Sequence, residues 1–406
     1  MSTARDTRRL LLVTHRPLDY AGPGSVRWRY LIGALPRHGW EVEVVTSRHN
    51  PTRDALSVDP GEARLAAMRV SVMRQVGRVM RPLYNRAGIE PEAFPPNVLW
   101  SFTARALLRR RAEAVRPDAV VATIPPPAAL FAAVGALGGK GMPIVADMRD
   151  NWAGHPAYDA GGSLLRRIED PVLRRTDAVV AVSEGMRAKL LRMHPWLGPR
   201  LHLMPNGFDP VLLDRRPPAL ERWPEKLTLI HPGVLYDDRS LKDLIAAMSR
   251  PGLRERFRLE IIGNIDDGTA AAMRDRPADV EIVTRPPMPW DDAMERVRDA
   301  HVVITIVPYT MGDDVAWPVK NFEAFALGKP VLSITTGGAT EALLRDLGVD
   351  VACARDGDVD SIAAALENLL AHPPLPPLPV ERISRWDRSV VARDYAALLD
   401  SLVDAR

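Results

Sequence analysis

The sequence predicts an α/β protein built from two doubly wound domains, each with its own parallel sheet. Three observations support this fold class: the length of the chain, an alternation of short apolar strands with helical segments, and a reversal of net charge between the two halves. At 406 residues the chain is longer than one hydrophobic core usually requires, so two domains of about 200 residues each are expected.

The alternation of strands and helices begins near the N-terminus. Residues 9–14 are predicted to form a short apolar strand, which a loop with Gly22 and Gly24 follows. A helix is then predicted over 26–39, and the next strand over 41–47. This strand–loop–helix–strand unit is typical of a parallel sheet with crossover helices. Further strands of the first half are expected at 118–124, 143–148, 177–183 and 201–206.

The same alternation restarts after Pro217 and Pro218, which places the domain boundary near 206–216. A helix is predicted near 240–249. Because doubly wound sheets bind ligands at the carboxyl ends of their strands, the loops that follow the strands are the expected site. The strands expected in the second half are 227–233, 258–264, 280–284, 301–308, 330–336 and 349–354.

The composition is that of a globular protein, with 46% apolar and 26% charged residues. No run of about 18 apolar residues predicts a membrane span. The first fifteen residues contain arginines, but their apolar run is too short for a signal peptide. The single cysteine, Cys353, excludes an internal disulfide and a cysteine-rich metal site, so a cytoplasmic location is expected.

Net charge differs in sign between the two halves. Residues 1–205 carry 30 Lys and Arg against 18 Asp and Glu, a balance of +12. Residues 206–406 carry 24 against 33, a balance of −9. The reversal again indicates two domains, and it predicts that the first one meets an anionic partner.

Two segments interrupt the alternation. Residues 52–100 contain no clear strand, and within them 69–81 reads as a basic amphipathic helix. Such a helix either lies on an anionic membrane surface or packs on its own domain, and both alternatives stay open. The proline-rich segment 372–379 predicts an extended linker, and 388–406 is predicted to form one helix.

The stretch PVKNFEAFALGKPVL at 318–332 predicts a short helix followed by a strand, because proline favours the start of a helix and glycine the position after its end. Lys320 and Glu323 would lie in the first turns, where free backbone N–H groups attract anions. The alternative is a helix cap with a solvent-facing ion pair. The apolar side chains expected to face a core are Phe322, Phe325, Ala326 and Leu327.

Several motifs follow one another in a definite order along the chain. They are a Gly-rich loop from Gly22 to Ser25, ADMRDNW at 146–152, VSEGMR at 182–187, PNGFD at 205–209 and PVKNFEAFALGKPV at 318–331. In this order they resemble the motifs of family 4 glycosyltransferases, which are retaining enzymes with the GT-B fold.

The resemblance implies two Rossmann-like domains that face each other across a cleft, with the last helix crossing back to the first domain. The acceptor-side domain would comprise 1–205 plus 385–406. The domain that binds the nucleotide sugar would comprise 206–384.

The resemblance also implies a nucleotide-diphosphate sugar as the donor. In the family, the helix that begins near Pro318 points at the diphosphate, and the glutamate, here Glu323, binds the ribose hydroxyls. A carboxylate can accept hydrogen bonds from both hydroxyls of a vicinal diol. Lys320 and Arg239 would form a cationic clamp on the diphosphate and act in catalysis. The other expected donor contacts are Gly22, Gly24, Ser25, Arg149, Gly233, Asp314, Val319 and Asn321.

Two positions depart from the family pattern. Many relatives carry a second glutamate that touches the transferred sugar, and Val315 stands there in this chain. Asp313 or Asp314 is expected to substitute for it, unless the contact is absent as in other branches. Val234 stands where relatives often have an arginine on the diphosphate.

Arg149 and Asp150 follow the end of a strand in the first half, where relatives place groups that touch the donor sugar or the acceptor. Asp150 is therefore expected to act in catalysis, against the alternative of a helix cap or turn. In the front-face mechanism that the family implies, the departing phosphate takes the acceptor proton, so no general base is assigned. Adjacent aspartates lack histidines at ligand spacing, and neither a metal nor another cofactor is expected.

The predicted function is hexosyltransferase-like: a sugar moves from a nucleotide-diphosphate sugar to an acceptor hydroxyl with retention, in a bacterial cell. The expected acceptor is anionic or lipid-linked, or a polysaccharide or secondary-metabolite precursor. A peripheral contact at the inner face of the membrane is expected, and no nucleic acid. The alternatives are a nucleotide-sugar epimerase, a pseudo-glycosyltransferase and a non-catalytic partner subunit. The sequence leaves the base, the sugar, the acceptor and the oligomeric state open.

Overall fold

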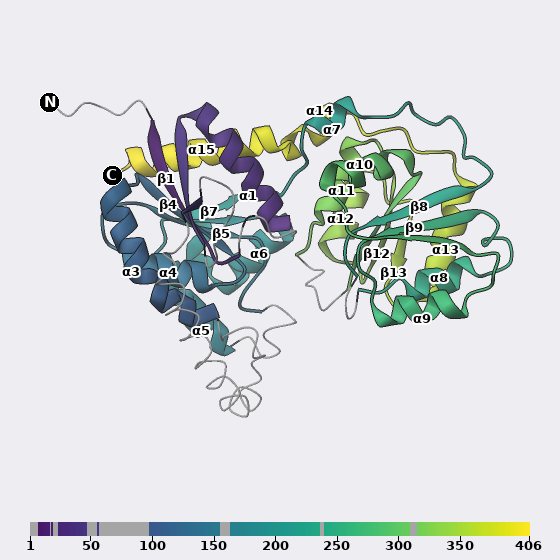
Figure 1. The fold of residues 1–406 in the computed structure, drawn as a ribbon, viewed down its shortest axis with the longest axis horizontal. Coiled ribbons are helices and arrows are strands. Elements are labelled where there is room, and N and C mark those ends of the chain that lie inside the picture. The colour runs from purple at the N-terminus through teal and green to yellow at the C-terminus, as the bar shows by residue number, and fades with distance from the viewer. Residues whose placement is uncertain are drawn as a thin grey trace. The chain divides into compact units, whose positions relative to one another are not determined.

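The computed structural model describes residues 7–16, 18, 23–46, 55–56, 97–154, 163–235, 239–308 and 315–406. By its contacts the chain divides into two compact units, which are Met1–Asn206 with Arg388–Arg406, and Gly207–Asp387 (Figure 1).

These boundaries lie within three residues of the expected ones, 205 and 384. Hydrogen bonds explain where the chain changes unit. In the second unit the amide of Phe208 donates to the carbonyl of Trp386 (2.9 Å). In the first unit Nε of Arg388 donates to the carbonyl of Asn206 (3.3 Å). Residues 385–387 therefore belong to the second unit rather than to the first.

The first unit contains a parallel sheet with strand order β3-β2-β1-β4-β5-β6-β7. Its strands are mostly continuous apolar runs, as expected where helices cover both faces. The order reverses between β1 and β4. The strands are β1 (Arg8–Thr14), β2 (Trp40–Val45), β3 (Ala55–Leu56), β4 (Ala119–Ile124), β5 (Ile144–Met148), β6 (Ala178–Ala181) and β7 (Leu201–Leu203).

Helix α15 (Arg388–Asp404) completes the core of the first unit (Figure 1). Tyr395 and Leu399 of α15 are buried in one cluster with Trp28 of α1 and with Leu10 and Val121 of the strands. The expectation that the last helix returns to the first domain is confirmed. The other helices of this unit are α1 (Pro23–Ala34), η1 (Leu35–His38), α3 (Asn97–Val115), α4 (Ala128–Leu137), α5 (Ser163–Leu173), α6 (Glu184–Met193) and η2 (Pro195–Arg200).

The second unit contains a parallel sheet with strand order β10-β9-β8-β11-β12-β13. The pattern repeats that of the first unit, with the first strand next to the point where the order reverses. The strands are β8 (Leu227–Pro232), β9 (Phe257–Ile262), β10 (Glu281–Arg285), β11 (Val302–Val307), β12 (Val331–Thr335) and β13 (Cys353–Arg355).

Two hydrophobic clusters cover the two faces of the second sheet. Leu229 and Ile304 belong to the cluster that includes α8 and α13, whereas Ile230 and Val303 belong to the cluster that includes α11 and α12. Neighbouring residues of a strand thus point to opposite faces. The helices are α7 (Val211–Asp214), α8 (Lys242–Met248), α9 (Asp267–Asp275), α10 (Trp290–Asp299), α11 (Val319–Ala326), α12 (Gly338–Asp346), α13 (Val359–Ala371), α14 (Val380–Ile383) and η4 (Ser384–Trp386).

The structure corrects two details of the first half. The helix expected over 26–39 ends at Ala34 and continues as a 3-10 turn, because Pro36 has no N–H to donate to the preceding turn. The stretch 52–100, in which no clear strand was expected, includes the short strand β3. The predicted amphipathic helix at 69–81 lies outside the described residues.

The segment 372–379 forms neither a helix nor a strand, as expected for a linker, but it is not detached from the domain. Leu378 is buried in the cluster that includes α11, and Pro377 lies against Gly328. In the described part of the chain, no helix is both long and apolar enough to cross a membrane.

Candidate functional site

The carboxyl ends of β8 and β11 form the topological switch point of the second sheet, since β8 pairs with β9 on one side and with β11 on the other. Doubly wound sheets bind ligands at such points. Gly233 follows β8 with a φ of +143°, a conformation that favours glycine. A Cβ on Gly263, which follows β9, would lie 2.7 Å from the carbonyl oxygen of Gly233. The absence of a side chain on Gly263 therefore lets the ends of β8 and β9 approach closely.

Helix α11 brings the predicted donor residues to this switch point. It forms where the sequence predicts, although Pro318 is the N-cap residue (φ −59°, ψ 134°) and not part of the first turn. Gly328 follows the C-cap with a φ of +69°. Phe322, Phe325, Ala326 and Leu327 are buried in one cluster, as expected. This apolar face anchors the helix on its own domain.

Lys320 lies directly over the glycine that follows β8. A Cβ on Gly233 would be only 2.8 Å from Nζ of Lys320, so any larger residue would displace the ammonium. Nζ also lies 3.1 Å from Nε2 of His231, the penultimate residue of β8. The structure thus brings two predicted site residues, Lys320 and Gly233, together at the switch point.

The surroundings of Lys320 shift its pKa strongly. Burial is the main cause, and the charge of Arg239 adds to it, so that the pKa falls to about 7, although Glu323 opposes the shift. Burial, Lys320 and Arg239 also hold the pKa of His231 well below its usual range. The charge of Arg239 therefore acts on both Lys320 and His231, and its part in a cationic clamp stays a prediction.

Glu323 is not a solvent-facing residue, being 7% exposed. Its Oε1 accepts a hydrogen bond from Nε1 of Trp290 at the start of α10 (2.9 Å). The low exposure argues against the alternative of an ordinary surface ion pair with Lys320. The indole orients the carboxylate.

The other predicted donor contacts on α11 have different environments. Val319 is half-buried, whereas Asn321 has no exposed surface, and its amide atoms have no hydrogen-bond partner among the described residues. The contact of Asn321 with the donor stays a prediction. Asp314 and Asp313 lie outside the described residues, and Val315 is buried.

In the first unit, the predicted Gly-rich loop becomes the start of a helix. α1 begins at Pro23, so Gly24 and Ser25 belong to its first turn, and Ser25 is 7% exposed. The N–H groups of a first turn lack partners within the helix and suit an anion. Gly22 lies outside the described residues.

Arg149 follows β5 and lies at the carboxyl end of the first sheet. Its Nε donates to Oγ1 of Thr123 (3.1 Å), and Nη2 donates to the carbonyl of Pro125 (3.0 Å). Burial lowers the pKa of the guanidinium, and the charges of Asp150 and Asp147 oppose the shift. Asp150 itself is exposed.

A buried carboxylate that the sequence analysis did not single out, Asp147, supports this strand end. It has no exposed surface and accepts hydrogen bonds from Trp28 Nε1 (2.8 Å), Thr123 Oγ1 (2.9 Å) and Arg27 Nη2 (3.3 Å). Thr123 thus links Asp147 to Arg149. An aspartate within an otherwise apolar strand was the signal that could have identified this residue.

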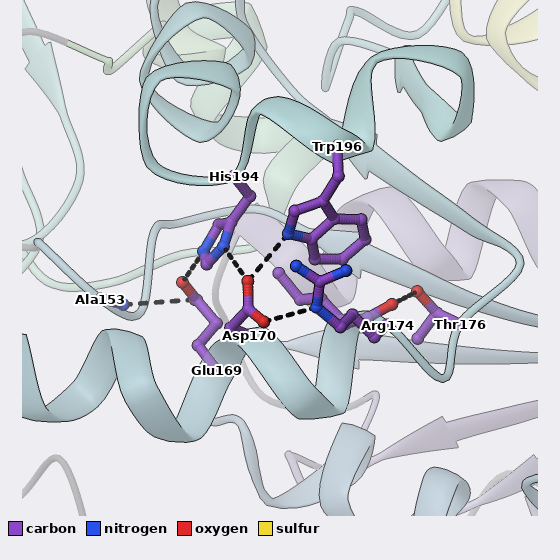
Figure 2. Close-up of polar contacts among 8 residues, drawn as sticks. Ala153, Glu169, Asp170, Arg174, Thr176, His194 and Trp196 are labelled. Carbon is purple, nitrogen blue, oxygen red and sulfur yellow. Dashed lines mark hydrogen bonds and ion pairs between the residues drawn. The ribbon is translucent and has the colours of Figure 1, made fainter.

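The loop after Asp150 is tied to α5 by a second buried cluster (Figure 2). Oε1 of Glu169 accepts a hydrogen bond from the amide of Ala153 (3.3 Å), and Oε2 lies 2.9 Å from Nε2 of His194. The other ring nitrogen of His194 lies 3.1 Å from Oδ1 of Asp170. Glu169 and His194 are almost completely buried. The backbone that follows Arg149 and Asp150 is therefore fastened to a charged cluster in which Glu169 and His194 are buried.

Both ring nitrogens of His194 face carboxylate oxygens, which only accept hydrogen bonds, so the arrangement fits an imidazolium. Burial alone would lower the pKa of His194, but Glu169 and Asp170 outweigh it and raise the pKa. Asp170 also accepts from Arg174 (2.7 Å) and Trp196 (2.8 Å). Burial opposes these donors, yet together with His194 they lower the pKa of Asp170 to about 2.

Within the described residues, no group of three or more His, Cys, Asp or Glu side chains could hold a metal ion.

Two family models match the chain. The model described as Glycosyltransferase Family 4 matches residues 24–212, and the one described as Glycosyl transferases group 1 matches residues 226–372. Together they cover most of both units. The chain therefore belongs to glycosyltransferase family 4. Comparison with curated protein sequences gives no match.

Solved structures show the same fold at low identity. A glycosyltransferase from Rickettsia africae has a TM-score of 0.68 and 11% identity over 99% of this chain and 100% of its own. An α,α-trehalose 6-phosphate synthase from Burkholderia multivorans has a TM-score of 0.65 and 15% identity over 98% and 100%. Anabaena HepE in complex with UDP-glucose has a TM-score of 0.56 and 12% identity over 98% and 97%. The fold is GT-B, an α/β architecture with two Rossmann-like domains.

Proposed function

We propose that the protein transfers a sugar from a nucleotide-diphosphate sugar to an acceptor hydroxyl, with retention of the anomeric configuration. The observation that carries this proposal is the position of Lys320, whose ammonium lies over Gly233 at the switch point of the second sheet. A fixed cation beside the first turn of a helix is suited to a diphosphate. The complex of Anabaena HepE with UDP-glucose supports a nucleotide sugar and makes UDP-glucose the first probe.

Catalysis in this proposal rests on charge. As the anomeric bond breaks, the diphosphate gains negative charge, and Lys320 and Arg239 stabilise this charge more strongly than that of the bound donor. Glu323, oriented by Trp290, binds the ribose hydroxyls. The proposed mechanism uses no metal or other cofactor, because two cations and a helix N-terminus supply the positive charge.

The first unit supplies the acceptor side in this proposal. Arg149 and Asp150 contact the transferred sugar or the acceptor, and the departing phosphate takes the proton of the acceptor hydroxyl. The positive balance of residues 1–205 favours an anionic acceptor, such as a lipid-linked sugar phosphate at the inner face of the membrane. The rival acceptor is a neutral soluble molecule in the cytoplasm.

Incubation of the purified protein with a panel of nucleotide sugars, with and without lipid extract, tests the proposal. The expected result is release of a nucleoside diphosphate that depends on the acceptor, together with a product that keeps the anomeric configuration. Conversion of the nucleotide sugar into its epimer without nucleotide release would identify an epimerase. No turnover with any donor and extract would favour a non-catalytic subunit.

Two variants connect the activity to the proposed clamp. Lys320→Ala and Arg239→Ala are expected to reduce turnover much more than the binding of uridine, which has no phosphates. Lys242→Ala in α8 is the matched control, because it removes a lysine that lies outside the proposed site. If uridine binding fell as much as turnover, the two cations would be structural.

A further inference from the structure

We infer that His231 is a positioning residue for the donor site: its main-chain contact holds the imidazole in one neutral tautomer, and its second ring nitrogen holds the ammonium of Lys320 over Gly233. This inference rests on the proposed function, since it concerns the lysine proposed to bind the diphosphate. His231 has no exposed surface and does not itself reach a ligand.

Hydrogen bonding defines the tautomer of His231. Nδ1 lies 3.2 Å from the carbonyl oxygen of Ile304 in the neighbouring strand β11. A carbonyl oxygen only accepts, so Nδ1 carries the proton, and in a neutral ring Nε2 then presents a lone pair. This lone pair faces Nζ of Lys320, which donates across 3.1 Å.

Burial and the surrounding charges keep the ring neutral. Burial is the main cause, and the charges of Lys320 and Arg239 add to it, so that the pKa of His231 lies well below its usual range. Glu323 acts on the lysine side, where it favours the ammonium. A protonated ring would place a second cation against Nζ and remove the acceptor, so only the neutral form can hold Lys320.

Besides contacting the imidazole, the end of the Lys320 side chain packs against Gly233. The site of a Cβ on Gly233 is 2.8 Å from Nζ and 2.9 Å from Cε, so the end of the side chain rests on bare backbone. Gly263 lies directly against the carbonyl of Gly233. The ammonium is therefore held by the imidazole and by a backbone surface before any donor binds, at the carboxyl end of β8.

These contacts determine how easily Lys320 loses its proton. Burial and Arg239 disfavour the charged form of Lys320, whereas the lone pair of His231 stabilises it. Removal of that lone pair should lower the pH at which Lys320 loses its proton. The affinity for a diphosphate should then fall near neutral pH, and the affinity for a nucleoside should not.

His231→Phe tests the inference, because phenylalanine keeps a flat ring and removes both nitrogens. His231→Gln, whose amide oxygen can accept from Lys320, is the conservative variant. His301→Phe is the matched control: His301 is a partly buried histidine of the same unit, and its Nδ1 accepts from the amide of Thr228 (2.8 Å), away from the carboxyl ends of the strands. Circular dichroism first establishes conditions under which all the variants are folded, and binding is measured under those conditions.

Calorimetry with UDP-glucose and uridine from pH 6 to 9 is the first measurement. The diphosphate of UDP-glucose is esterified at both ends and does not titrate in this range. His231→Phe is expected to bind UDP-glucose about tenfold more weakly at pH 7.5, the size of one charge-assisted hydrogen bond. The midpoint of its pH profile should move to lower pH. His231→Gln should recover most of the affinity, and the His301→Phe profile should match that of the unchanged protein. An unaltered profile for His231→Phe would overturn the inference.

NMR titration of Lys320 separates failure of this inference from failure of the proposed function. The lysines are labelled by reductive ¹³C-methylation, and Lys320→Arg assigns the signal. A midpoint near neutral pH that falls in His231→Phe supports the inference even if UDP-glucose does not bind. The same midpoint in both proteins contradicts it, whatever the donor is.

Discussion

Lys320 and Glu323 lie one turn apart on α11, yet their side chains contact different groups. Nζ of Lys320 lies beside the imidazole of His231 and bare backbone, so a cation is directed to the switch point. Glu323 is oriented by the indole of Trp290 and keeps an anionic group beside that cation. At the scale of single residues, the proposed site thus combines a cation, which would suit a phosphate, with a carboxylate, which would suit hydroxyls.

Substitution of Glu323 by alanine should weaken the binding of a nucleotide sugar roughly ten- to hundredfold, because a charge-assisted hydrogen bond is worth about 1.5–3 kcal/mol. Calorimetry with UDP-glucose measures the change. Trp290→Phe, which removes only the hydrogen bond to Oε1, should give a smaller loss. Glu367→Ala, an exposed position on α13, is the control. Unchanged affinity in Glu323→Ala would exclude the ribose contact.

The buried ion pair between Arg27 and Asp147 should contribute to the stability of the folded protein. Both side chains are almost completely buried, with 3.3 Å between Nη2 and Oδ1. Asp147→Leu should destabilise the protein by about 3–5 kcal/mol, because it leaves a buried guanidinium without its anion. Urea unfolding measures the loss, and the exposed Asp394→Asn on α15 serves as the control.

Arg27→Met combined with Asp147→Leu completes a double-mutant cycle. The double variant should lose less stability than the sum of the single ones, because neither charge is then left alone. Additive losses would mean that the two charges do not support each other.

At the scale of elements, the cluster in Figure 2 joins α5, the turn after α6, and the loop that follows β5. His194 lies between two carboxylates, an arrangement that fits an imidazolium, and Glu169 also accepts a hydrogen bond from the amide of Ala153. Because three segments depend on one ring, its protonation should be visible in the stability of the whole first unit.

The stability that His194 contributes should decrease in alkaline solution. Its pKa in the folded protein is raised above the ordinary 6.5, so the contribution is fully present below pH 6.5 and is lost as the pH rises through the folded-state value. Between pH 6 and 9, Tm should fall by about 2–4 °C for each ~1 kcal/mol lost. Thermal melts of His194→Leu should not show this pH-dependent loss.

His38→Gln is the control for that comparison, since His38 is exposed in the same unit. An NMR signature of a neutral His194 ring at pH 6 would contradict the assignment. Asp170, whose pKa is lowered to about 2, should add a separate loss only in strong acid, below its unfolded-state value of 3.8.

At the scale of the whole molecule, charge is the property that divides the two units. Residues 1–205 are strongly basic and 206–406 are acidic. On α3, Arg109 and Arg110 are exposed, and Phe102 is 57% exposed. Exposed arginines with an aromatic ring suit the surface of an anionic bilayer, where each basic residue contributes on the order of 1 kcal/mol.

The protein should therefore sediment with anionic vesicles and not with neutral ones. High salt should abolish binding, because the Debye length is about 8 Å at physiological ionic strength. Arg109→Glu with Arg110→Glu should weaken binding at least tenfold, and Arg222→Glu with Lys226→Glu in the acidic unit should not. The change of Arg74, Arg78 and Arg81 to Glu tests the amphipathic helix predicted outside the described residues. Absence of binding at low salt would exclude surface docking.

The sequence by itself determined most of the fold, because parallel sheets with covering helices leave a strong local pattern. Apolar runs of five to seven residues marked nearly every strand, and Pro318 with Gly328 marked the ends of α11. The place of Lys320 and Glu323 in the first turns of α11 was predictable because the helix ends are local features, whereas their roles at the site stay a prediction. β3 was missed because two residues are too few to show any period.

Only the tertiary structure decided what each site residue contacts. The partner of Lys320 lies 89 positions away along the chain, and the two residues of the Arg27–Asp147 pair are 120 apart. The cluster around His194 likewise joins α5 to a turn about 25 residues later. Such contacts arise where strands and helices distant in sequence converge at one edge of a sheet. Local periodicity records which face of a strand or helix is buried, but not which side chain of another element it meets there.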